Sequence, residues 1–490
     1  MMSLDKTIDS IFAPIADICE AFIFFNIPID LYNPMTSAFT EVKIPLIVLW
    51  LVGAGFFFTI YLRFLNIRHF KHALQCLTKK YAEPNAKGQI SNFDSLSACL
   101  SATIGLGNIA GVAVAISIGG AGAAFWMAIM GIVGMGSKFA EVMLGVKYRQ
   151  FPNPNDPNEV MGGPMYYLRD GFANRGMKKI GLILAGFFAV CCIGGAIGGG
   201  NMYQVNQVYQ QALHATGGET SFLFEKGWMF GVAMAVLAGL VTLGGLNSIA
   251  KVAARLTPIM AFIYIVAGLI VIGVNYQNIP HGIAEIFKSA WSLEAGWGGL
   301  IGAIIAGFRR AAFSNEAGIG TAAIIQSAAK TDYPVRQGLV AGLGPFFDTV
   351  IVCMITALVI VFSGVHQGAG EMKGIELTSL AFETVIPFFD IILTCVVFLF
   401  AYSTIIVYSH YGEVCAGYLF GPKKQVLIGF RIIFLIFIVI GSAAALENVI
   451  RFSDAMFFAM SIPNIIGLYL MSREIKRDTR DYLVNMGLNK

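Results

Sequence analysis

Charged residues are scarce in this sequence: only 13% of its 490 residues are Asp, Glu, Lys or Arg, whereas 57% are hydrophobic. Water-soluble domains carry about 25% charged residues. Together with a mean hydropathy of +0.71, this shortage excludes an ordinary soluble protein and indicates an integral membrane protein. The 55 glycines and 39 phenylalanines fit membrane helices, in which small residues let backbones approach closely.

Motifs that mark several other protein classes are missing. The eight cysteines form no Cys-x-x-Cys pair, so we expect small core residues rather than disulfides or metal ligands. No Gly-x-x-x-x-Gly-Lys-Ser/Thr loop is present, so ATP is not expected as an energy source. His-Glu-x-x-His, paired catalytic carboxylates and a Ser–His arrangement are also missing. We therefore expect neither an enzyme nor a covalent cofactor, and no nucleic-acid partner.

Apolar segments near the roughly 20-residue length of a membrane helix recur along the chain. Several exceed that length, which indicates tilt or interruption. No cleavable leader is evident at the N-terminus. The segments predict an all-α membrane protein with about eleven spans, at 44–62, 93–117, 121–146, 180–213, 228–245, 252–274, 298–328, 337–363, 378–418, 425–443 and 453–471.

Lys and Arg are distributed unevenly between alternate connections. Most lie in the connections 63–92 and 147–179 and in the tail 473–490, while the intervening loops hold few. Because positive residues stay cytoplasmic, we expect the cytoplasmic membrane as the location, with the N-terminus outside and the C-terminus inside. The basic, amphipathic segment 68–80 is expected to lie on the inner surface.

Two glycine-rich motifs interrupt apolar stretches in corresponding places of the two halves. They are ATIGLGN at 102–108 and NEAGIGT at 315–321, which share the core Gly-[Leu/Ile]-Gly-[Asn/Thr]. In a bilayer, unpaired backbone groups are tolerated only where they are buried in protein or line a wet cavity. Paired interruptions of this kind are typical of a secondary transporter whose site lies at the membrane midplane.

The order of the spans predicts an inverted repeat. Without the first helix, ten spans divide into two sets of five with opposite orientations, as in inverted-topology carriers. We expect an N-terminal extracytoplasmic segment (1–43), a first helix with a cytoplasmic connection (44–92), repeat 1 (93–275), repeat 2 (276–472) and a basic tail (473–490). Gly105 and Gly318 each fall on the first helix of their repeat.

Polar residues near the first break could bind an amino acid and a cation. A broken helix offers amide N–H groups to a carboxylate and carbonyl oxygens to Na⁺, and Asn108 could ligate either. The adjacent hydroxyls Ser403-Thr404 could hold an ion or simply bond to the preceding turn. The amide-rich patch 201–206, with Gln204 at its centre, could line a polar path or join helices.

Ionisable residues inside predicted spans are candidates for function because burying a charge is costly. Glu316, in the second break, could pair with Arg309-Arg310; a structural or gating pair is favoured over a proton relay. Lys138 and Glu141 are spaced as a satisfied i,i+3 pair. Asp348 is expected near a span end, where water would solvate it.

The motifs are similar to those of the alanine/glycine:cation symporter family, the sodium–alanine carriers of bacteria and archaea. The matching stretches run through both predicted repeats and cover most of the chain beyond the first span. They are 101–127 (SATIGLGNIAGVAVAISIGG with AAFWM), 138–149 (KFAEVMLGVKYR), 162–168 (GGPMYYL), 201–207 (NMYQVNQ), 313–324 (FSNEAGIGTAAI) and 400–413 (FAYSTIIVYSHYGE).

This resemblance implies a LeuT-type fold of five plus five helices, preceded by one helix, and Na⁺-coupled uptake of a small neutral amino acid, alanine or glycine first. It assigns carbonyls and hydroxyls around Na⁺ to Ser101, Ile104, Phe400, Ser403 and Thr404. It implies a substrate pocket made by Gly105, Leu106, Gly107, Asn108, Gln204, Gly318, Gly320, Thr404 and Tyr408, with the Leu106 and Gly107 amides on the substrate carboxylate.

The sequence departs from the family pattern at Leu106, where Thr is usual, and at Val407-Tyr408, where Gly-Trp is usual. These changes put the choice of substrate in question. Proton coupling is the alternative within the transporter class. From another class, an ion channel would predict a continuous polar path and symmetric oligomers. The oligomeric state is not readable from the sequence, and a monomer is compatible with it.

Overall fold

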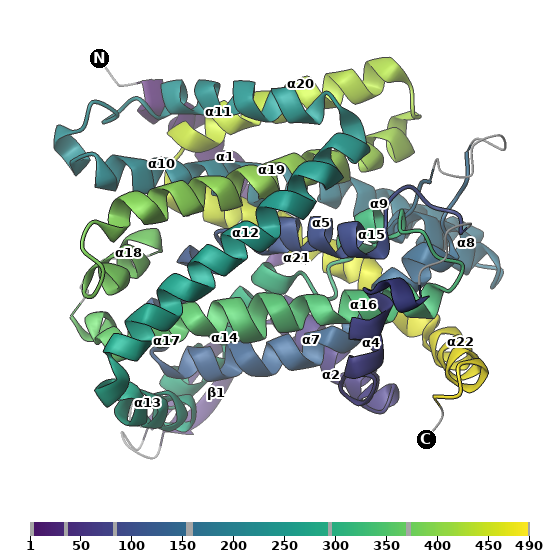
Figure 1. The fold of residues 1–490 in the computed structure, drawn as a ribbon, viewed down its shortest axis with the longest axis horizontal. Coiled ribbons are helices and arrows are strands. Elements are labelled where there is room, and N and C mark those ends of the chain that lie inside the picture. The colour runs from purple at the N-terminus through teal and green to yellow at the C-terminus, as the bar shows by residue number, and fades with distance from the viewer. Residues whose placement is uncertain are drawn as a thin grey trace.

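The computed structural model describes residues 4–33, 38–81, 86–152, 160–292, 296–368 and 374–488. Figure 1 shows a bundle of mostly long helices, many of them side by side. Its first half contains α1 (Leu4–Ile23), β1 (Asn26–Asn33), β2 (Ala38–Pro45), α2 (Leu46–Tyr61), α3 (Leu65–Arg68), α4 (Phe70–Cys76), α5 (Asn92–Thr103), α6 (Ala110–Gly119), α7 (Gly122–Lys147), α8 (Pro164–Ala173), α9 (Lys178–Ile197), α10 (Tyr203–Ala215), α11 (Gly227–Thr242) and α12 (Gly245–Val274).

The second half is likewise helical over its described residues. It contains α13 (Ile279–Trp291), α14 (Gly296–Asn315), α15 (Ala322–Gln326), α16 (Pro334–Pro345), α17 (Met354–Ser363), α18 (Ile375–Glu383), α19 (Phe389–Phe420), α20 (Lys424–Ala443), α21 (Leu446–Leu470) and α22 (Ser472–Asn485). π-Helical turns join α9 to α10 (η2, Gly198–Met202) and α16 to α17 (η5, Phe346–Cys353). Short 3₁₀ turns lie at Lys79–Tyr81, Gly218–Thr220, Tyr276–Asn278 and Val365–Gln367.

A helix and a β-hairpin precede the first apolar helix. β1 and β2 pair antiparallel, with Asn26 opposite Pro45. α1 packs against α21, and Asp9 Oδ1 accepts hydrogen bonds of 2.8 Å from the Ala445 N–H and from Asn448 Nδ2. The described part of the predicted segment 1–43 is thus helix and hairpin, and α1 packs on the bundle.

Helices of membrane-spanning character dominate the bundle. Each of the eleven segments expected from the sequence contains helix, which confirms an all-α membrane protein apart from the hairpin. α2, α6 and α11 are apolar but shorter. The number of spans and the repeat layout stay predictions. Seven described helical stretches are long and apolar enough to cross a membrane: Gly122–Lys147, Lys178–Ala215, Gly245–Val274, Pro334–Ser363, Phe389–Phe420, Lys424–Ala443 and Leu446–Leu470.

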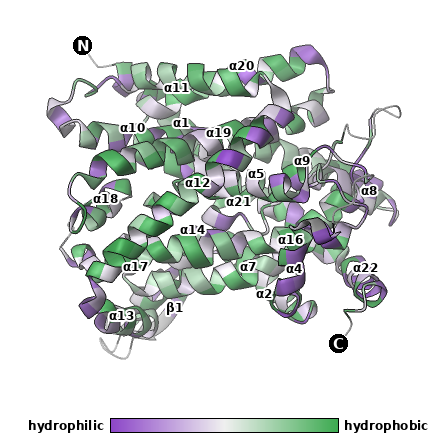
Figure 2. Ribbon diagram, viewed as in Figure 1, coloured by the Kyte–Doolittle hydropathy of each residue, from purple (hydrophilic) through white to green (hydrophobic). Residues whose placement is uncertain are grey.

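The outside of the bundle is suited to lipid. Figure 2 shows that hydrophobic residues extend along most of the long helices. Ile183 and Leu240 are each 71% exposed and Phe262 is 68% exposed. An apolar surface of this kind is unfavourable in water and matches the hydrocarbon core of a bilayer.

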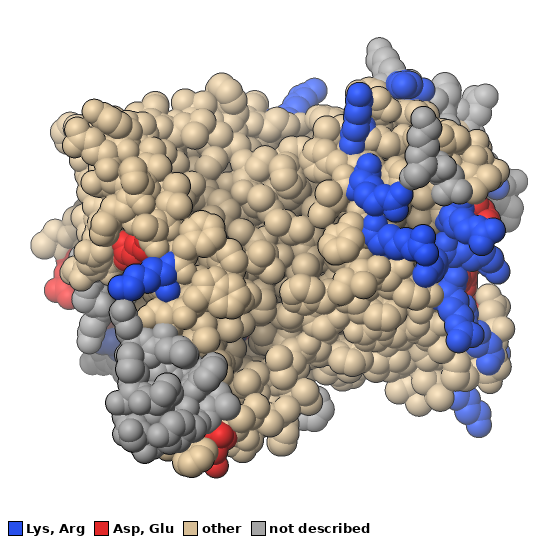
Figure 3. Space-filling view, turned by 90° about the horizontal axis from the view of Figure 1, so that it is seen from below, with Lys and Arg blue, Asp and Glu red and all other residues tan. Residues whose placement is uncertain are grey.

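Lys and Arg gather at one end of the molecule (Figure 3), the end at which α4, α8 and α22 lie in Figure 1. We call it the basic end. It holds the described parts of the connections 63–92 and 147–179 and of the tail, from which the sequence predicts a cytoplasmic face. The orientation in the membrane itself stays a prediction.

Both predicted helix breaks are present. α5 ends at Thr103 and α6 begins at Ala110, while α14 ends at Asn315 and α15 begins at Ala322. All residues of both breaks are buried. α7 packs against α14 and α15, and α19 packs against α5. The irregular backbone therefore lies inside protein, as a membrane requires.

Candidate substrate and ion site

The first break places backbone N–H groups inside the bundle. The Gly105 N–H donates to Asn108 Oδ1 at 3.0 Å, and the Leu106 N–H donates to Gln204 Oε1 at 3.3 Å. The Gly107 N–H has no acceptor among the described residues. Because buried amides are nearly always paired, the Gly107 N–H, with Leu106 beside it, is suited to an incoming anion such as a carboxylate.

Asn108 shapes the turn and does not line the cavity described below. Its amide oxygen accepts from Gly105, while its Nδ2 donates to Asp348 Oδ1 at 2.7 Å. Its carbonyl accepts from Thr356 Oγ1 at 2.8 Å. The side chain is thus fixed between the break and η5, and direct contact with a substrate stays a prediction.

Oxygen atoms from α5 and α19 meet beside this break. Thr404 Oγ1 lies 3.0 Å from the carbonyl oxygens of both Ser101 and Phe400, which share its one proton, and Ser403 Oγ donates to the Phe400 carbonyl at 2.9 Å. Ser101 Oγ is buried and has no hydrogen-bond partner in the described chain. An unpartnered buried hydroxyl among carbonyl and hydroxyl oxygens fits a hard cation such as Na⁺. Ile104, the fifth predicted ligand, directly follows α5.

A small cavity lies between the two breaks. Its volume is about 220 Å³, counting space open to solvent. Backbone and side chains from both broken helices meet there with aromatic rings from α14, α19 and α21. The residues that line it are Ala102, Thr103, Gly107, Gly199, Gln204, Phe313, Glu316, Tyr408 and Phe457.

Glycines make the close packing around this cavity possible. A Cβ on Gly105 would lie 2.8 Å from Thr404 Oγ1, so the break can approach α19 only without a side chain. In η2, a Cβ on Gly200 would lie 2.0 Å from Tyr408 Cγ. The glycine-rich turn η2 therefore gives the Tyr408 ring its place beside the cavity.

The second break presents a carboxyl group to the cavity. Glu316 adopts a left-handed conformation with φ of 56°, which turns the chain away from the α14 axis. Its Oε1 accepts from the Tyr408 hydroxyl and its Oε2 from Thr321 Oγ1. Lys138 Nζ donates to the Asn315 carbonyl at 2.9 Å and lies 3.8 Å from Glu141 Oε1, which confirms the predicted Lys138–Glu141 pair.

The predicted pairing of Glu316 with Arg309-Arg310 is wrong. Both arginines instead pair with Asp454 of α21, at 2.7 Å for Arg309 Nη2. The reason is the left-handed turn at Glu316: the arginines sit on α14, whereas the glutamate has left that helix and faces α19.

Gly318 and Gly320 provide the turn of the second break but do not line the cavity. Their φ values are 84° and 101°, a conformation that favours glycine. The Gly318 N–H donates to Glu141 Oε2 at 3.2 Å, and its carbonyl accepts from Asn464 Nδ2 at 2.8 Å. A Cβ on Gly320 would lie 2.7 Å from Pro164 Cγ. Their predicted substrate role stays a prediction.

The model of the sodium:alanine symporter family matches residues 30–489. The chain belongs to this family. The sodium/alanine symporter AgcS of Methanococcus maripaludis is 40% identical over 441 residues, which cover 89% of this chain and 94% of that relative. The probable sodium/glutamine symporter GlnT of Bacillus subtilis is 32% identical over 440 residues, which cover 89% and 87%.

A solved structure shows the same fold. The crystal structure of MhsT in complex with L-phenylalanine matches 79% of this chain and 89% of MhsT with a TM-score of 0.52 and 16% identity. At this identity the match concerns the fold alone. The predicted LeuT-type architecture of this sodium:alanine symporter family member is thereby confirmed.

Two carboxyl groups of this family member are buried although the sequence analysis did not predict it. Asp348 is fully buried and accepts from Asn108 Nδ2, Ser314 Oγ at 2.7 Å and Thr349 Oγ1 at 2.8 Å. Its expected solvation at a span end is wrong, because α16, η5 and α17 form one continuous stretch with Asp348 near its middle. That central place in the predicted span 337–363 was the available signal. Asp454, which pairs with the two arginines, was not singled out at all.

The amide-rich patch of the fourth predicted span divides into two roles. Asn201 Nδ2 donates to the Phe434 carbonyl at 2.6 Å, and Asn206 Nδ2 donates to the Gly441 carbonyl at 2.9 Å. These two amides join η2 and α10 to α20. Gln204 alone reaches the first break and the cavity.

Proposed function

We propose that this protein is a Na⁺-coupled symporter that imports a small neutral amino acid, alanine or glycine first, by alternating access. Membership in the sodium:alanine symporter family supports the reaction class. The observation that carries the proposal is the cavity between the two breaks, beside the oxygen cluster of Ser101, Phe400, Ser403 and Thr404. The protein would lie in the cytoplasmic membrane with its N-terminus outside and its C-terminus inside.

The cavity offers complementary groups to the two charged ends of an amino acid. On one side, the Gly107 N–H can receive the α-carboxylate, and the Leu106 N–H can join it by exchanging its hydrogen bond to Gln204 for one to the substrate. On the other side, the Glu316 carboxylate can attract the α-ammonium group. A zwitterion would thus bridge the two broken helices, which ties its binding to their relative position.

Na⁺ would bind at the same break, next to the carboxylate site. The proposed oxygens come from Ser101 and Ile104 at the end of α5 and from Phe400, Ser403 and Thr404 of α19. Gly105 separates the two sites, and its backbone lies against Thr404. Occupying the cation site would therefore fix the segment that presents its N–H groups to the substrate, which gives coupling without covalent chemistry.

Aromatic rings and the residues that depart from the family pattern limit substrate size. The cavity is lined by the rings of Phe313, Tyr408 and Phe457. Leu106 and Val407 are fully buried, and each is adjacent in the chain to a residue that lines the cavity. The relative GlnT is named for glutamine, a larger substrate than alanine. We therefore propose a small neutral amino acid as the substrate. Competition assays would rank alanine, glycine and serine by their affinity.

Uptake of labelled alanine into proteoliposomes, with and without an inward Na⁺ gradient, tests the proposal. Thr404→Ala removes a hydroxyl ligand, and we expect the Na⁺ concentration for half-maximal uptake to rise about tenfold. Thr394→Ala is the matched control, since that hydroxyl bonds to Asp390 elsewhere on α19. The proposed Na⁺ site would be wrong if alanine uptake did not depend on Na⁺, or if the Thr404→Ala variant had the same Na⁺ dependence as the parent protein.

Proton coupling is the second candidate, and Asp348 favours it. This buried carboxyl group hydrogen-bonds to Asn108 at the first break, and a protonatable group next to the site is what a proton-coupled carrier needs. An inward proton gradient without Na⁺ separates the candidates. Uptake under that gradient would establish proton coupling, whereas uptake under a Na⁺ gradient alone supports the first candidate.

A further inference from the structure

A groove opens at the basic end, between the segment Tyr61–His69 and one face of α22. It encloses about 1110 Å³, counting space open to solvent. Arg63 and Arg68 line one wall, Lys476 and Arg480 line the other, and all four side chains are exposed. None of the lining residues of the described chain is acidic. We call this the basic groove.

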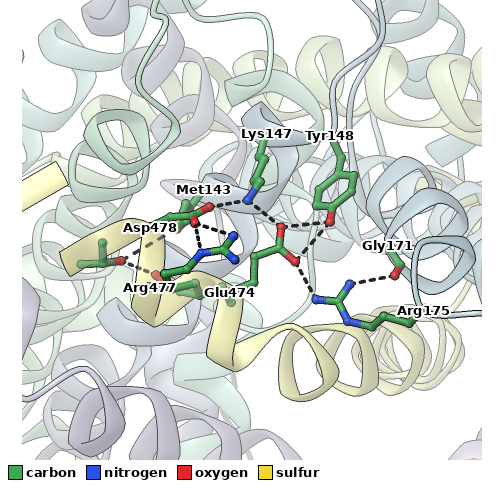
Figure 4. A network of polar contacts seen from close by, with 10 residues as sticks. Met143, Lys147, Tyr148, Gly171, Arg175, Glu474, Arg477 and Asp478 are labelled. Atoms are coloured by element: carbon green, nitrogen blue, oxygen red, sulfur yellow. Dashed lines mark hydrogen bonds and ion pairs between the residues drawn. The ribbon is translucent and has the colours of Figure 1, made fainter. Parts of the chain in front are cut away.

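Two acidic residues of α22 that do not line the groove, Glu474 and Asp478, pair with basic residues elsewhere. Glu474 binds Lys147 and Arg175, each at 2.6 Å, and Asp478 also binds Lys147 (Figure 4). Burial alone would raise the pKa of Glu474, but the hydrogen bonds from Lys147 and Arg175 outweigh it and lower the pKa. These ionised contacts fix α22 against α7 and α8, so Glu474 and Asp478 are engaged away from the groove wall that carries Lys476 and Arg480.

The groove adjoins an apolar surface. Leu62, Leu65 and Leu483 are buried among its lining residues. Next to it, Ile60 is 61% exposed and Phe64 is 50% exposed. Since α2 is an apolar helix that ends at Tyr61, the groove lies where hydrocarbon would give way to water.

The backbone places Arg63 at this boundary. Arg63 and Phe64 both have φ of 55°, a left-handed conformation that non-glycine residues rarely adopt. The resulting turn ends α2 and brings Arg63 to the groove. On the facing wall, Lys476 Nζ lies 4.2 Å from the centre of the Tyr61 ring, so the two walls are already in contact.

We propose that the basic groove binds the headgroup of an anionic phospholipid. The phosphodiester would lie between the arginines of the first wall and Lys476 and Arg480 of the second, because guanidinium groups pair well with phosphate oxygens. The acyl chains would follow Ile60 and Phe64 along α2. Burial together with the neighbouring Arg68 lowers the pKa of His69, so this lining histidine adds no charge at neutral pH.

The test uses the purified full chain in neutral detergent and short-chain dioctanoyl lipids. We expect dioctanoyl phosphatidylglycerol to bind and to raise the melting temperature by several degrees, while dioctanoyl phosphatidylcholine and inorganic phosphate do neither. In Arg63→Gln/Arg480→Gln the affinity should fall at least tenfold. Lys178→Gln/Lys179→Gln, which removes the same charge from exposed residues outside the groove, should bind like the parent protein.

Each other outcome contradicts the proposal. Equal binding of the two lipids would indicate detergent-like adsorption, and equal binding of inorganic phosphate would indicate a simple anion site. An equal loss of lipid affinity in both double variants would indicate that binding depends on the overall positive charge of the basic end and not on the groove. If the first double variant does not fold, Arg480→Gln alone decides, since this exposed side chain has no hydrogen bond to lose in the described chain. No transport is measured, so the result is independent of the proposed function.

Discussion

At the scale of single residues, the space around Gly105 constrains the proposed cation and substrate sites together. Its φ lies outside the left-handed region, so alanine could adopt the backbone conformation. A Cβ would nevertheless lie 2.8 Å from Thr404 Oγ1 and 3.2 Å from Gln204 Oε1. Both neighbours belong to the proposed cation and substrate sites, so one added methyl group would disturb both.

We expect Gly105→Ala to fold and to lose at least tenfold in Na⁺-driven uptake, because overpacking of this size costs about 1–3 kcal/mol. Gly186→Ala is the control, since a Cβ there meets no atom within 4 Å. Uptake and detergent-solubilised melting temperature should be measured for both. If Gly105→Ala and Gly186→Ala had the same uptake, the close approach of α5 to α19 would not be required for transport.

Single residues near the breaks were predictable where local chemistry decides. Thr404 and Ser101, which the resemblance groups around Na⁺, are in contact, because the Thr404 hydroxyl donates to the Ser101 carbonyl. Their role as Na⁺ ligands stays a prediction. The partner of Arg310 was not predictable, because Asp454 is 144 positions away in the sequence. Glu316 was misassigned, because no sequence pattern reveals that a non-glycine residue turns left-handed there.

At the scale of elements, Arg149 joins the segment that precedes α5 to the segment that follows α15. It follows α7, and its guanidinium donates to the carbonyls of Ser327 at 2.9 Å, Ala329 at 2.8 Å and Thr331 at 2.7 Å. It also donates to the Lys87 carbonyl at 3.0 Å. The loop after α15 is thereby held against the segment before α5, at the basic end of both broken helices.

We expect Arg149→Lys to loosen this end, because an ammonium group cannot reach four carbonyls that a planar guanidinium spans. Cys99 of α5 is 1% exposed, and its alkylation by N-ethylmaleimide, followed by mass spectrometry, should become several-fold faster. Arg169→Lys is the control, since Arg169 bonds to the neighbouring Asp170. An unchanged rate of Cys99 alkylation in Arg149→Lys would show that the hydrogen bonds of Arg149 do not limit access to α5 from the basic end.

Helices were predictable as elements wherever twenty or so apolar residues recur, since the bilayer dictates their length. The predicted span 378–418 is nonetheless divided, with α18 ending at Glu383 and α19 beginning at Phe389. Pro387 was the available signal, because the residue before a proline disfavours helix. The hairpin of β1 and β2 lies before the first span, where membrane-helix length offered no guide.

At the scale of the whole molecule, buried carboxyl groups outnumber buried cations around the two breaks. Arg310 pairs with Asp454, which leaves Lys138 as the one cation of this group facing three carboxyl groups. Buried charge without a partner is strongly unfavourable. Bound Na⁺ and a substrate ammonium group, or a proton, would restore the balance. The buried charged residues here are Lys138, Glu141, Arg310, Glu316, Asp348 and Asp454.

This charge balance predicts the effect of Asp348→Asn. Removing one negative charge near the first break should weaken cation binding, and we expect the Na⁺ concentration for half-maximal uptake to rise about tenfold. Asp390→Asn, at the start of α19, removes the same charge and should have little effect. If the parent protein also takes up alanine under a proton gradient, Asp348→Asn should abolish the proton-driven uptake but not the Na⁺-driven uptake. A variant with unchanged Na⁺ and pH dependence would mean that Asp348 only fixes Asn108, and the excess negative charge would then have to be balanced at Glu141 or Glu316.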